Sequence, residues 1–115
     1  MDVADSDSND GTRLQLYTCN GSGAQRWNVP GDGTLRALGK CADVDHSGTE
    51  NGTAVQLYRC NQSGAQQWEA RDDGSLRNPD SGRCLSVQDG RTDDETPLTI
   101  WDCGVDTGQI WHLPT

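Results

Sequence analysis

The sequence predicts an all-β fold of three similar units, because one motif recurs in phase along the chain and turn-forming residues recur around it. A Trp follows a Cys by eight residues at three places, and successive Trp residues lie 41 and 43 positions apart in the 115-residue chain. Gly, Pro, Asn and Asp interrupt the sequence every 8–12 residues, as in proteins with many short strands, and no window of 11 or more residues shows helical periodicity. A unit of about 42 residues is too small to bury a core alone, so the three should pack into one domain. The pairs are Cys19/Trp27, Cys60/Trp68 and Cys103/Trp111.

The clearest strand of each unit lies just before this Cys. In residues 14–17, two Leu alternate with Gln15 and Tyr17, so a strand directs the Leu side chains to one face and the other two to the opposite face. The Leu face must be core. The Tyr face can present an aromatic ring beside polar groups, which is what a sugar requires. The pattern repeats at residues 55–58, with Tyr58, and at residues 98–101, with Trp101.

The repeated text resembles the ricin B-type lectins, whose bacterial branch is also called carbohydrate-binding module family 13. The middle unit fits best, with Cys-Ala-Asp-Val at 41–44, Gly-Thr-Ala-Val-Gln-Leu-Tyr-Arg-Cys-Asn at 52–61 and Ala-Gln-Gln-Trp at 65–68. The resemblance covers nearly the whole chain. It implies a β-trefoil of twelve short strands, four per unit, with up to three shallow sugar pockets. We expect units near residues 1–37, 38–80 and 81–115 of a single carbohydrate-binding domain.

The resemblance also implies two disulfides, Cys41–Cys60 and Cys84–Cys103, and the identical spacing of 19 residues supports this pairing. Such bridges indicate an oxidising, extracellular origin, so we expect a secreted protein. A zinc site is the alternative, but the sequence has no Cys-x-x-Cys and no clustered His. Cys19 has no mate at that spacing. We therefore expect a first unit that is truncated and lacks its leading strand.

The pocket of the family uses the Asp of Cys-x-Asp to accept hydrogen bonds from sugar hydroxyls, an aromatic ring to stack on the sugar, and a nearby Asn, while the Gln of Gln-x-Trp supports the pocket. The last unit departs from this set, because Ser86, Thr99 and Gly104 replace the Asp, a Gln and the Asn. We expect that third pocket to be inactive or weak. The carbohydrate-binding residues expected from the resemblance are Asp43, Gln56, Tyr58, Asn61 and Gln66 in the middle unit, Asp2, Gln15, Tyr17, Asn20 and Gln25 in the first, and Trp101 in the last.

Structural roles compete with these assignments. The three Trp of the Gln-x-Trp motifs are expected in the core. The Gln residues of the same motifs can equally tie loops together without contacting sugar. Asp43 can bond nearby backbone in a turn, and Tyr58 can be an ordinary half-exposed strand residue.

Composition and motifs exclude several partners and cofactors. A net charge of −9 argues against nucleic acid and anionic membrane surfaces, and no long apolar run is present. Residues 5–9 resemble the opening of a calcium loop, but an EF-hand needs Gly and Glu where Asp10 and Leu16 stand, so we expect no metal and no cofactor.

The sequence favours a non-catalytic module that binds galactose- or xylose-type sugars or polysaccharide. We expect it to target a catalytic domain of a secreted bacterial glycoside hydrolase to its substrate. A freestanding lectin is the alternative of the same kind, and a trefoil inhibitor or other protein-interaction domain is another. An enzyme is less favoured, because glycoside hydrolysis needs two facing carboxylic acids, one with a raised pKa. Glu50, Glu69 and Glu95 lie in polar surroundings with no apolar pocket implied.

Overall fold

Three antiparallel hairpins form the centre of the molecule. The computed structural model describes residues 1–18, 23–25, 27–88, 91, 93–104, 109 and 111. Its strands confirm the all-β prediction, because the helical elements of the described residues are short 3₁₀ turns. The hairpins pair β1 (Asp2–Val3) with β2 (Thr12–Leu16), β4 (Lys40–Val44) with β5 (Val55–Tyr58), and β8 (Arg83–Val87) with β9 (Thr96–Trp101).

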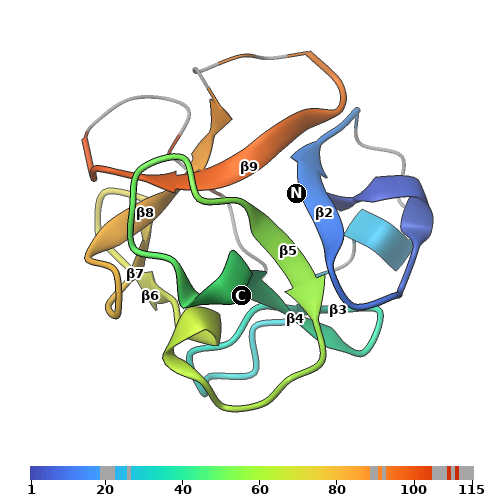
Figure 1. Cartoon of the computed structure of the whole chain (residues 1–115), viewed down its shortest axis with the longest axis horizontal. Helices are drawn as coiled ribbons and strands as arrows, with labels where there is room; N and C mark the ends of the chain where they lie inside the picture. The colour runs from blue at the N-terminus through green and yellow to red at the C-terminus, as the bar shows by residue number, and fades with distance from the viewer. Residues whose placement is uncertain are drawn as a thin grey trace.

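The hairpins close around a common axis. Strand β2 pairs with both β5 and β9, and a bridge between Ala54 and Thr99 joins the β5 side to β9. Figure 1 shows β2, β5 and β9 surrounding the centre of the molecule. The three second strands thus contact one another pairwise, which places the start of each unit beside its neighbour.

The same register recurs in the hairpins and sets the positions of the candidate site residues. Asp2 pairs with Gln15 across β1 and β2, Asp43 pairs with Gln56 across β4 and β5, and Ser86 pairs with Thr99 across β8 and β9. Strand β1 has two residues where β4 and β8 have five, so the leading strand of the first unit is shortened and still pairs with β2.

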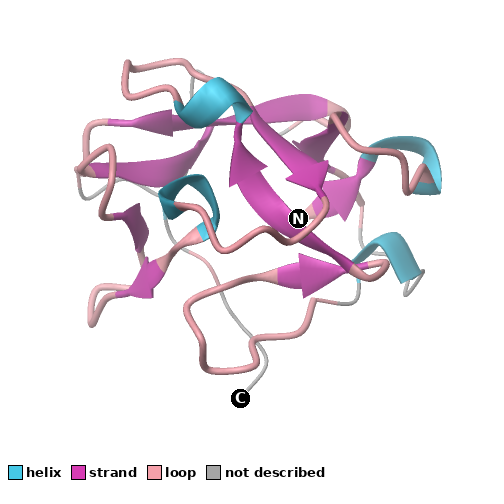
Figure 2. Ribbon diagram, turned by 60° about the horizontal axis from the view of Figure 1, so that its bottom comes forward, coloured by secondary structure: helices cyan, strands magenta, loops and turns pink. Residues whose placement is uncertain are grey.

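Smaller strands cover one end of these hairpins. Strand β3 (Arg36–Ala37) pairs with β4, β7 (Leu76–Asn78) pairs with β8, and β6 (Glu69–Ala70) pairs with β7. The 3₁₀ turns lie in the connections, as Figure 2 shows. They are η1 (Ala4–Ser6), η2 (Gly23–Gln25), η3 (Asp45–Ser47) and η4 (Gly64–Gln66).

The core follows the predicted alternation. The Leu face of the second strands is inside, since Leu14, Leu57 and Leu98 are fully buried. The aromatic face is outside, with Tyr17 and Trp101 40% and 48% exposed. Burying each large aliphatic side chain contributes about 1.5–3 kcal/mol, and this face is repeated three times.

The Trp residues of the Gln-x-Trp motifs pack against the core, as predicted. Trp27 and Trp68 are buried, and Trp111 is half-buried against the core cluster. Their indole N–H groups donate to the carbonyls of Met1 (3.1 Å), Ala42 (3.2 Å) and Leu85 (3.1 Å). Each indole therefore fixes the leading strand of its own unit and satisfies its buried donor.

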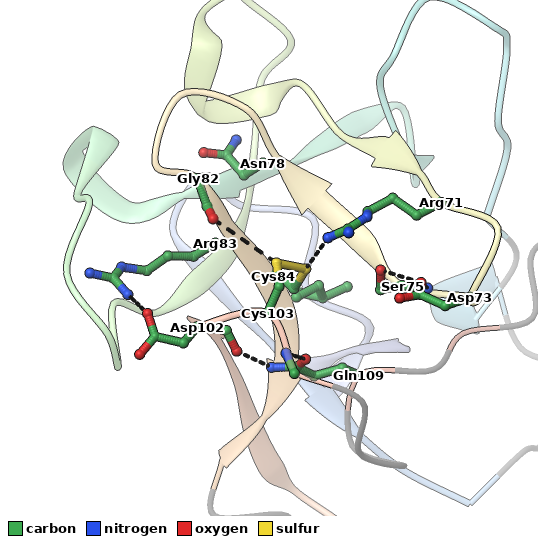
Figure 3. The surroundings of a disulfide bond; sticks show 12 residues. Arg71, Asp73, Ser75, Asn78, Gly82, Arg83, Cys84, Asp102, Cys103 and Gln109 are labelled. Carbon is green, nitrogen blue, oxygen red and sulfur yellow. Dashed lines mark hydrogen bonds and ion pairs between the residues drawn. A yellow bond between two sulfur atoms is a disulfide. The ribbon is translucent and has the colours of Figure 1, made fainter.

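Both predicted disulfides are formed. Cys41 bonds to Cys60 and Cys84 to Cys103, each across 19 residues. Figure 3 shows the second bridge between β8 and the residues that follow β9, beside the ion pair of Arg83 with Asp102. Each bridge contributes about 3 kcal/mol in the chain-entropy model. Cys19 lies outside the described residues.

No helix in the described residues has the length and apolar character needed to cross a membrane.

Candidate functional site

The middle unit forms a shallow pocket of about 400 Å³ beside the aromatic face of β5. Four of the five site residues predicted for this unit line it, and these are Asp43, Gln56, Tyr58 and Asn61. The strand register explains the grouping, because Asp43 on β4 lies opposite Gln56 on β5, and Tyr58 lies two residues further along the same face. Gly11, Asp45, His46, Ser47 and Ser63 complete the lining.

Asp43 is the most constrained group in this pocket. It is only 6% exposed, and its two carboxylate oxygens accept from Gln56 Nε2 at 3.3 Å and from Gln66 Nε2 at 2.8 Å. Burial raises the pKa of Asp43 above the usual Asp value, although the two amide hydrogen bonds oppose that rise. An oriented, poorly solvated carboxylate is a strong acceptor for hydroxyl donors.

Gln66 holds Asp43 in place from below the pocket. Its side chain is fully buried. Its Oε1 accepts from the backbone N–H of Asn61 at 2.9 Å, and its Nε2 donates to the Arg59 carbonyl at 2.8 Å as well as to Asp43. Of the two roles open from the sequence, loop support is therefore the one that its position fits, because its amide is occupied within the protein.

The ring and the amide at the rim complete the predicted set. Tyr58 is half-buried, with the Arg59 guanidinium 5.8 Å from its ring centroid. Asn61 is exposed, and its Oδ1 accepts from the backbone N–H of Ser63 at 3.0 Å. This bond fixes the Asn61 side chain through its oxygen, and Asn61 lines the pocket with Nδ2 as its remaining donor.

Sequence reasoning missed five lining residues, which are three from η3 together with Gly11 and Ser63. The η3 turn contributes Asp45, His46 and Ser47, and both His46 and Ser47 adopt positive φ (52° and 54°), an unusual backbone for non-Gly residues. His46 Nδ1 lies 2.7 Å from Asp45 Oδ1. Gly11 comes from the first unit, so this pocket is shared between neighbours. The signal that the sequence offers is the similarity of the loops that form η1 and η3, at corresponding places in the first two repeats.

The first unit has a smaller pocket of about 240 Å³. Asp2, Gln15 and Tyr17 line it as predicted, and Gln15 Nε2 donates to Asp2 Oδ2 at 3.0 Å. Gln25 is half-buried, and its Nε2 donates to the Thr18 carbonyl at 2.9 Å, so it also ties a loop. Asn20 lies outside the described residues. The other lining residues are Val3, Asp5, Ser6 and Glu95, the last from the third unit.

The third unit retains the aromatic ring without the acid. Trp101 is largely exposed, whereas Ser86 and Thr99 are buried. Ser86 Oγ donates to the Val87 carbonyl at 3.4 Å. Gln109 repeats the loop bonds of Gln66, accepting from the Gly104 N–H at 2.8 Å and donating to the Asp102 carbonyl at 2.9 Å (Figure 3). The scaffold of the pocket is thus present, but Ser86 supplies no anionic acceptor.

The described residues contain no group of three or more His, Cys, Asp and Glu side chains arranged to hold a metal ion. The middle pocket offers side chains for direct recognition: an oriented carboxylate, amides and a ring around a shallow, open surface.

Known proteins resemble this chain in sequence. The sequence model of the ricin-type β-trefoil lectin domain matches residues 1–111. Serine protease 1 of Rarobacter faecitabidus is 44% identical over 111 residues, which is 96% of this chain and 21% of that protein. A glucan endo-1,3-β-glucosidase of Cellulosimicrobium cellulans is 57% identical over 91 residues, which is 78% of this chain and 17% of that protein. The chain therefore spans about a fifth of the length of these two relatives.

A solved structure shares the fold. A non-toxic homologue of type II RIPs from Momordica charantia (bitter gourd), in complex with α-methyl-D-galactoside, superposes with a TM-score of 0.87 at 27% identity. The match covers 96% of this chain and 41% of that one.

Proposed function

The chain belongs to the ricin-type β-trefoil lectin domain family, and from that premise we propose that it is a non-catalytic module that binds carbohydrate, with the middle pocket as its main site. The observation that carries the proposal is the grouping of Asp43, Gln56, Tyr58 and Asn61 around one pocket. A sugar needs an acceptor for its hydroxyls, a ring for its C–H face and further amides for orientation. These four side chains provide them.

Each residue has a role in this proposal. The Asp43 carboxylate accepts hydrogen bonds from two vicinal hydroxyls, while Gln56 and Gln66 fix its orientation through 3.3 Å and 2.8 Å bonds. The ring of Tyr58 covers the apolar face of the sugar. Asn61 Nδ2 donates to a hydroxyl at the rim. Because few atoms make contact in a shallow pocket, we expect affinity between millimolar and high micromolar.

The three pockets should differ in strength. The first has the Asp2–Gln15 pair and Tyr17 and should bind sugar. The third lacks the carboxylate and should bind weakly or not at all. The sugar we propose is of the galactose or xylose type, and the bitter gourd homologue with its bound methyl galactoside supports galactose as the first test.

We further propose that the module targets a secreted bacterial enzyme to polysaccharide. Two observations support this. A glucan endo-1,3-β-glucosidase contains a region that is 57% identical to this chain and makes up about a sixth of that enzyme. The two disulfides suit an oxidising compartment. Two pockets on one rigid module raise avidity for a repeating polymer.

Chemical-shift titration of the labelled protein with galactose and with xylo-oligosaccharides tests the proposal. We expect shifts at residues 43, 56, 58 and 61, strong weakening in Asp43→Ala, and unchanged binding in Ser86→Ala, which is the matched control in the third unit. If Asp43→Ala binds as the parent does and Ser86→Ala abolishes binding, the assignment of the main site is wrong.

A further inference from the structure

One residue from the neighbouring unit occupies the same place beside β2, β5 and β9, and it lines the first and middle pockets. The backbone N–H of Gly11 donates to the Leu57 carbonyl (2.8 Å), that of Gly52 to the Ile100 carbonyl (2.9 Å), and that of Glu95 to the Leu16 carbonyl (2.7 Å). The acceptor lies one residue before the pocket aromatic in every case.

The side-chain direction at this place is toward the pocket. Gly11 lines the middle pocket, and a Cβ there would lie 3.9 Å from Gln56 Oε1. A Cβ at Gly52 would lie 3.8 Å from the ring of Trp101. Glu95 lines the first pocket. Glu95 of the third unit therefore adds a carboxylate to the pocket of the first unit.

The backbone at this place suits glycine. Gly11 and Gly52 have φ of 89°, and Glu95 has φ of 70°. A non-Gly residue is strained in this region, so Glu95 holds its place at a cost in stability. Within the described residues its carboxylate makes no hydrogen bond or ion pair, and it is free to meet a ligand.

The first pocket therefore has a charge that the middle pocket lacks. Its lining includes the carboxylates of Asp2, Asp5 and Glu95 and no Lys, Arg or His. Asp2 is 6% exposed and already fixed on one oxygen by Gln15. In the middle pocket, Gly11 stands in place of Glu95 and His46 in place of Asp5. Its second carboxylate, Asp45, lies 2.7 Å from His46 Nδ1, so the first pocket has three carboxylates and the middle pocket two.

We propose that Glu95 determines the specificity of the first pocket and makes it prefer an amino sugar, whose ammonium group it binds, over the neutral sugar. This rests on the proposed function, since it assumes that the pocket binds sugar through Asp2 and Tyr17. A protonated amine donates charge-assisted hydrogen bonds to carboxylates, and the mutual repulsion of the three acids falls when a cation enters. A uronic acid carries a carboxylate in place of the amine, and the three acids of the pocket repel it.

The test compares galactosamine, galactose and galacturonic acid by chemical-shift titration, with the first pocket read at Tyr17 and the middle pocket at Tyr58. At the first pocket we expect galactosamine to bind about three- to tenfold tighter than galactose, with the preference shrinking at high salt. Glu95→Gly should remove it, and Glu95→Gln should do the same without changing size. At the middle pocket galactose and galactosamine should bind within about twofold.

The reciprocal variant is Gly11→Glu, which places the same acid over the middle pocket, where a Cβ meets Gln56 Oε1 at an ordinary contact distance of 3.9 Å and takes on the backbone strain that Glu95 already bears at positive φ. It should transfer the amino-sugar preference to Tyr58. Equal binding of the two sugars at Tyr17, unchanged in Glu95→Gly, overturns the inference while galactose shifts at Tyr58 uphold the proposed function. If no sugar shifts either Tyr, the proposed function itself fails.

Discussion

Asp94 Oδ1 accepts a hydrogen bond from the backbone N–H of Thr18 at 2.7 Å, although 76 positions separate the two residues. The Thr18 hydroxyl adds bonds of 2.9 Å to both oxygens of Asp94. The same contact recurs around the molecule, from the Arg59 N–H to Asp10 (2.9 Å) and from the Asp102 N–H to Asn51 (2.8 Å). Each one holds the residue that follows a pocket aromatic, so one unit fixes the ring of the next.

Asp94→Ala should weaken sugar binding at the first pocket and lower the free energy of unfolding by about 1 kcal/mol, because the Thr18 amide loses its acceptor. Asp94→Asn is the matched control, since Asn51 performs the same task with an amide. Chemical denaturation and titration at Tyr17 measure the two effects. Binding at Tyr58 should stay as in the parent, and an Asp94→Asn variant as impaired as Asp94→Ala would contradict the backbone role.

Sugar binding at the middle pocket should depend on pH through Asp43. Burial raises the pKa of this carboxyl, so it takes up a proton at a higher pH than an ordinary Asp, whose pKa is about 3.9. Affinity at Tyr58 should then fall as the pH is lowered, before ordinary carboxylates titrate. Asp43→Asn should bind weakly at every pH. Binding that stays constant down to the ordinary Asp pKa would show that the ionised form is not needed.

The same carboxyl should reduce stability at neutral pH. A carboxyl with a raised folded-state pKa binds protons more tightly in the folded protein, so its ionisation destabilises the fold as the pH rises through that pKa, and the penalty is absent below the unfolded value. The melting temperature of Asp43→Asn relative to that of the parent should therefore rise between acid and pH 7, on top of a loss at every pH because Asn supplies one acceptor where Asp43 supplies two. Thermal melts of both proteins across this pH range measure the difference in melting temperature. The other carboxylates are the same in both proteins, so their contributions cancel in this difference.

Gln66→Ala and Gln109→Ala should separate loop support from site support. Each removes an amide that ties a loop by two backbone bonds, and each should lower the free energy of unfolding by about 1–3 kcal/mol, since buried polar groups lose their partners. Gln66 alone of this pair also bonds Asp43. Sugar affinity at Tyr58 should fall in Gln66→Ala and stay unchanged in Gln109→Ala. Equal affinity in both variants would show that the Gln66–Asp43 bond does not position the carboxylate.

Glu95→Gly should stabilise the protein by about 1 kcal/mol, because it relieves a non-Gly residue of positive φ. The added freedom of Gly in the unfolded chain opposes part of this gain. Glu95→Ala keeps the strain and removes the carboxylate, so it serves as the control for charge. Denaturant titration of the three proteins should place Glu95→Gly above the other two.

Four residues of the middle pocket could be predicted from the sequence, because strand periodicity and the family resemblance both describe residues within one repeat. Two-residue alternation places Gln56 and Tyr58 on one face of a strand, and the family resemblance adds Asp43, which lies opposite Gln56 in the hairpin. Gln66 shows the limit of that reasoning, since its depth below the surface depends on packing that a motif does not describe.

Gly11 and Glu95 could not be assigned in this way. They reach a pocket only after the ring of hairpins has closed, so their role depends on contacts between units. The shortened leading strand is a similar case. The sequence predicts a first unit without its leading strand, and the structure corrects this, because two residues are enough to form β1 and to pair Asp2 with Gln15.

Because the middle and first pockets each take a lining residue from the preceding unit of the ring, the boundaries of the repeat are not the boundaries of the binding site. A single repeat of this kind would bind sugar only as a ring of three copies, each completing the site of another. After triplication within one gene, a substitution in one repeat alters the ligand choice of its neighbour and leaves its own unchanged. On the inference drawn above, Glu95 is a position of this kind: specificity in this architecture can differ from one pocket to the next through residues that lie outside the repeat whose site they complete.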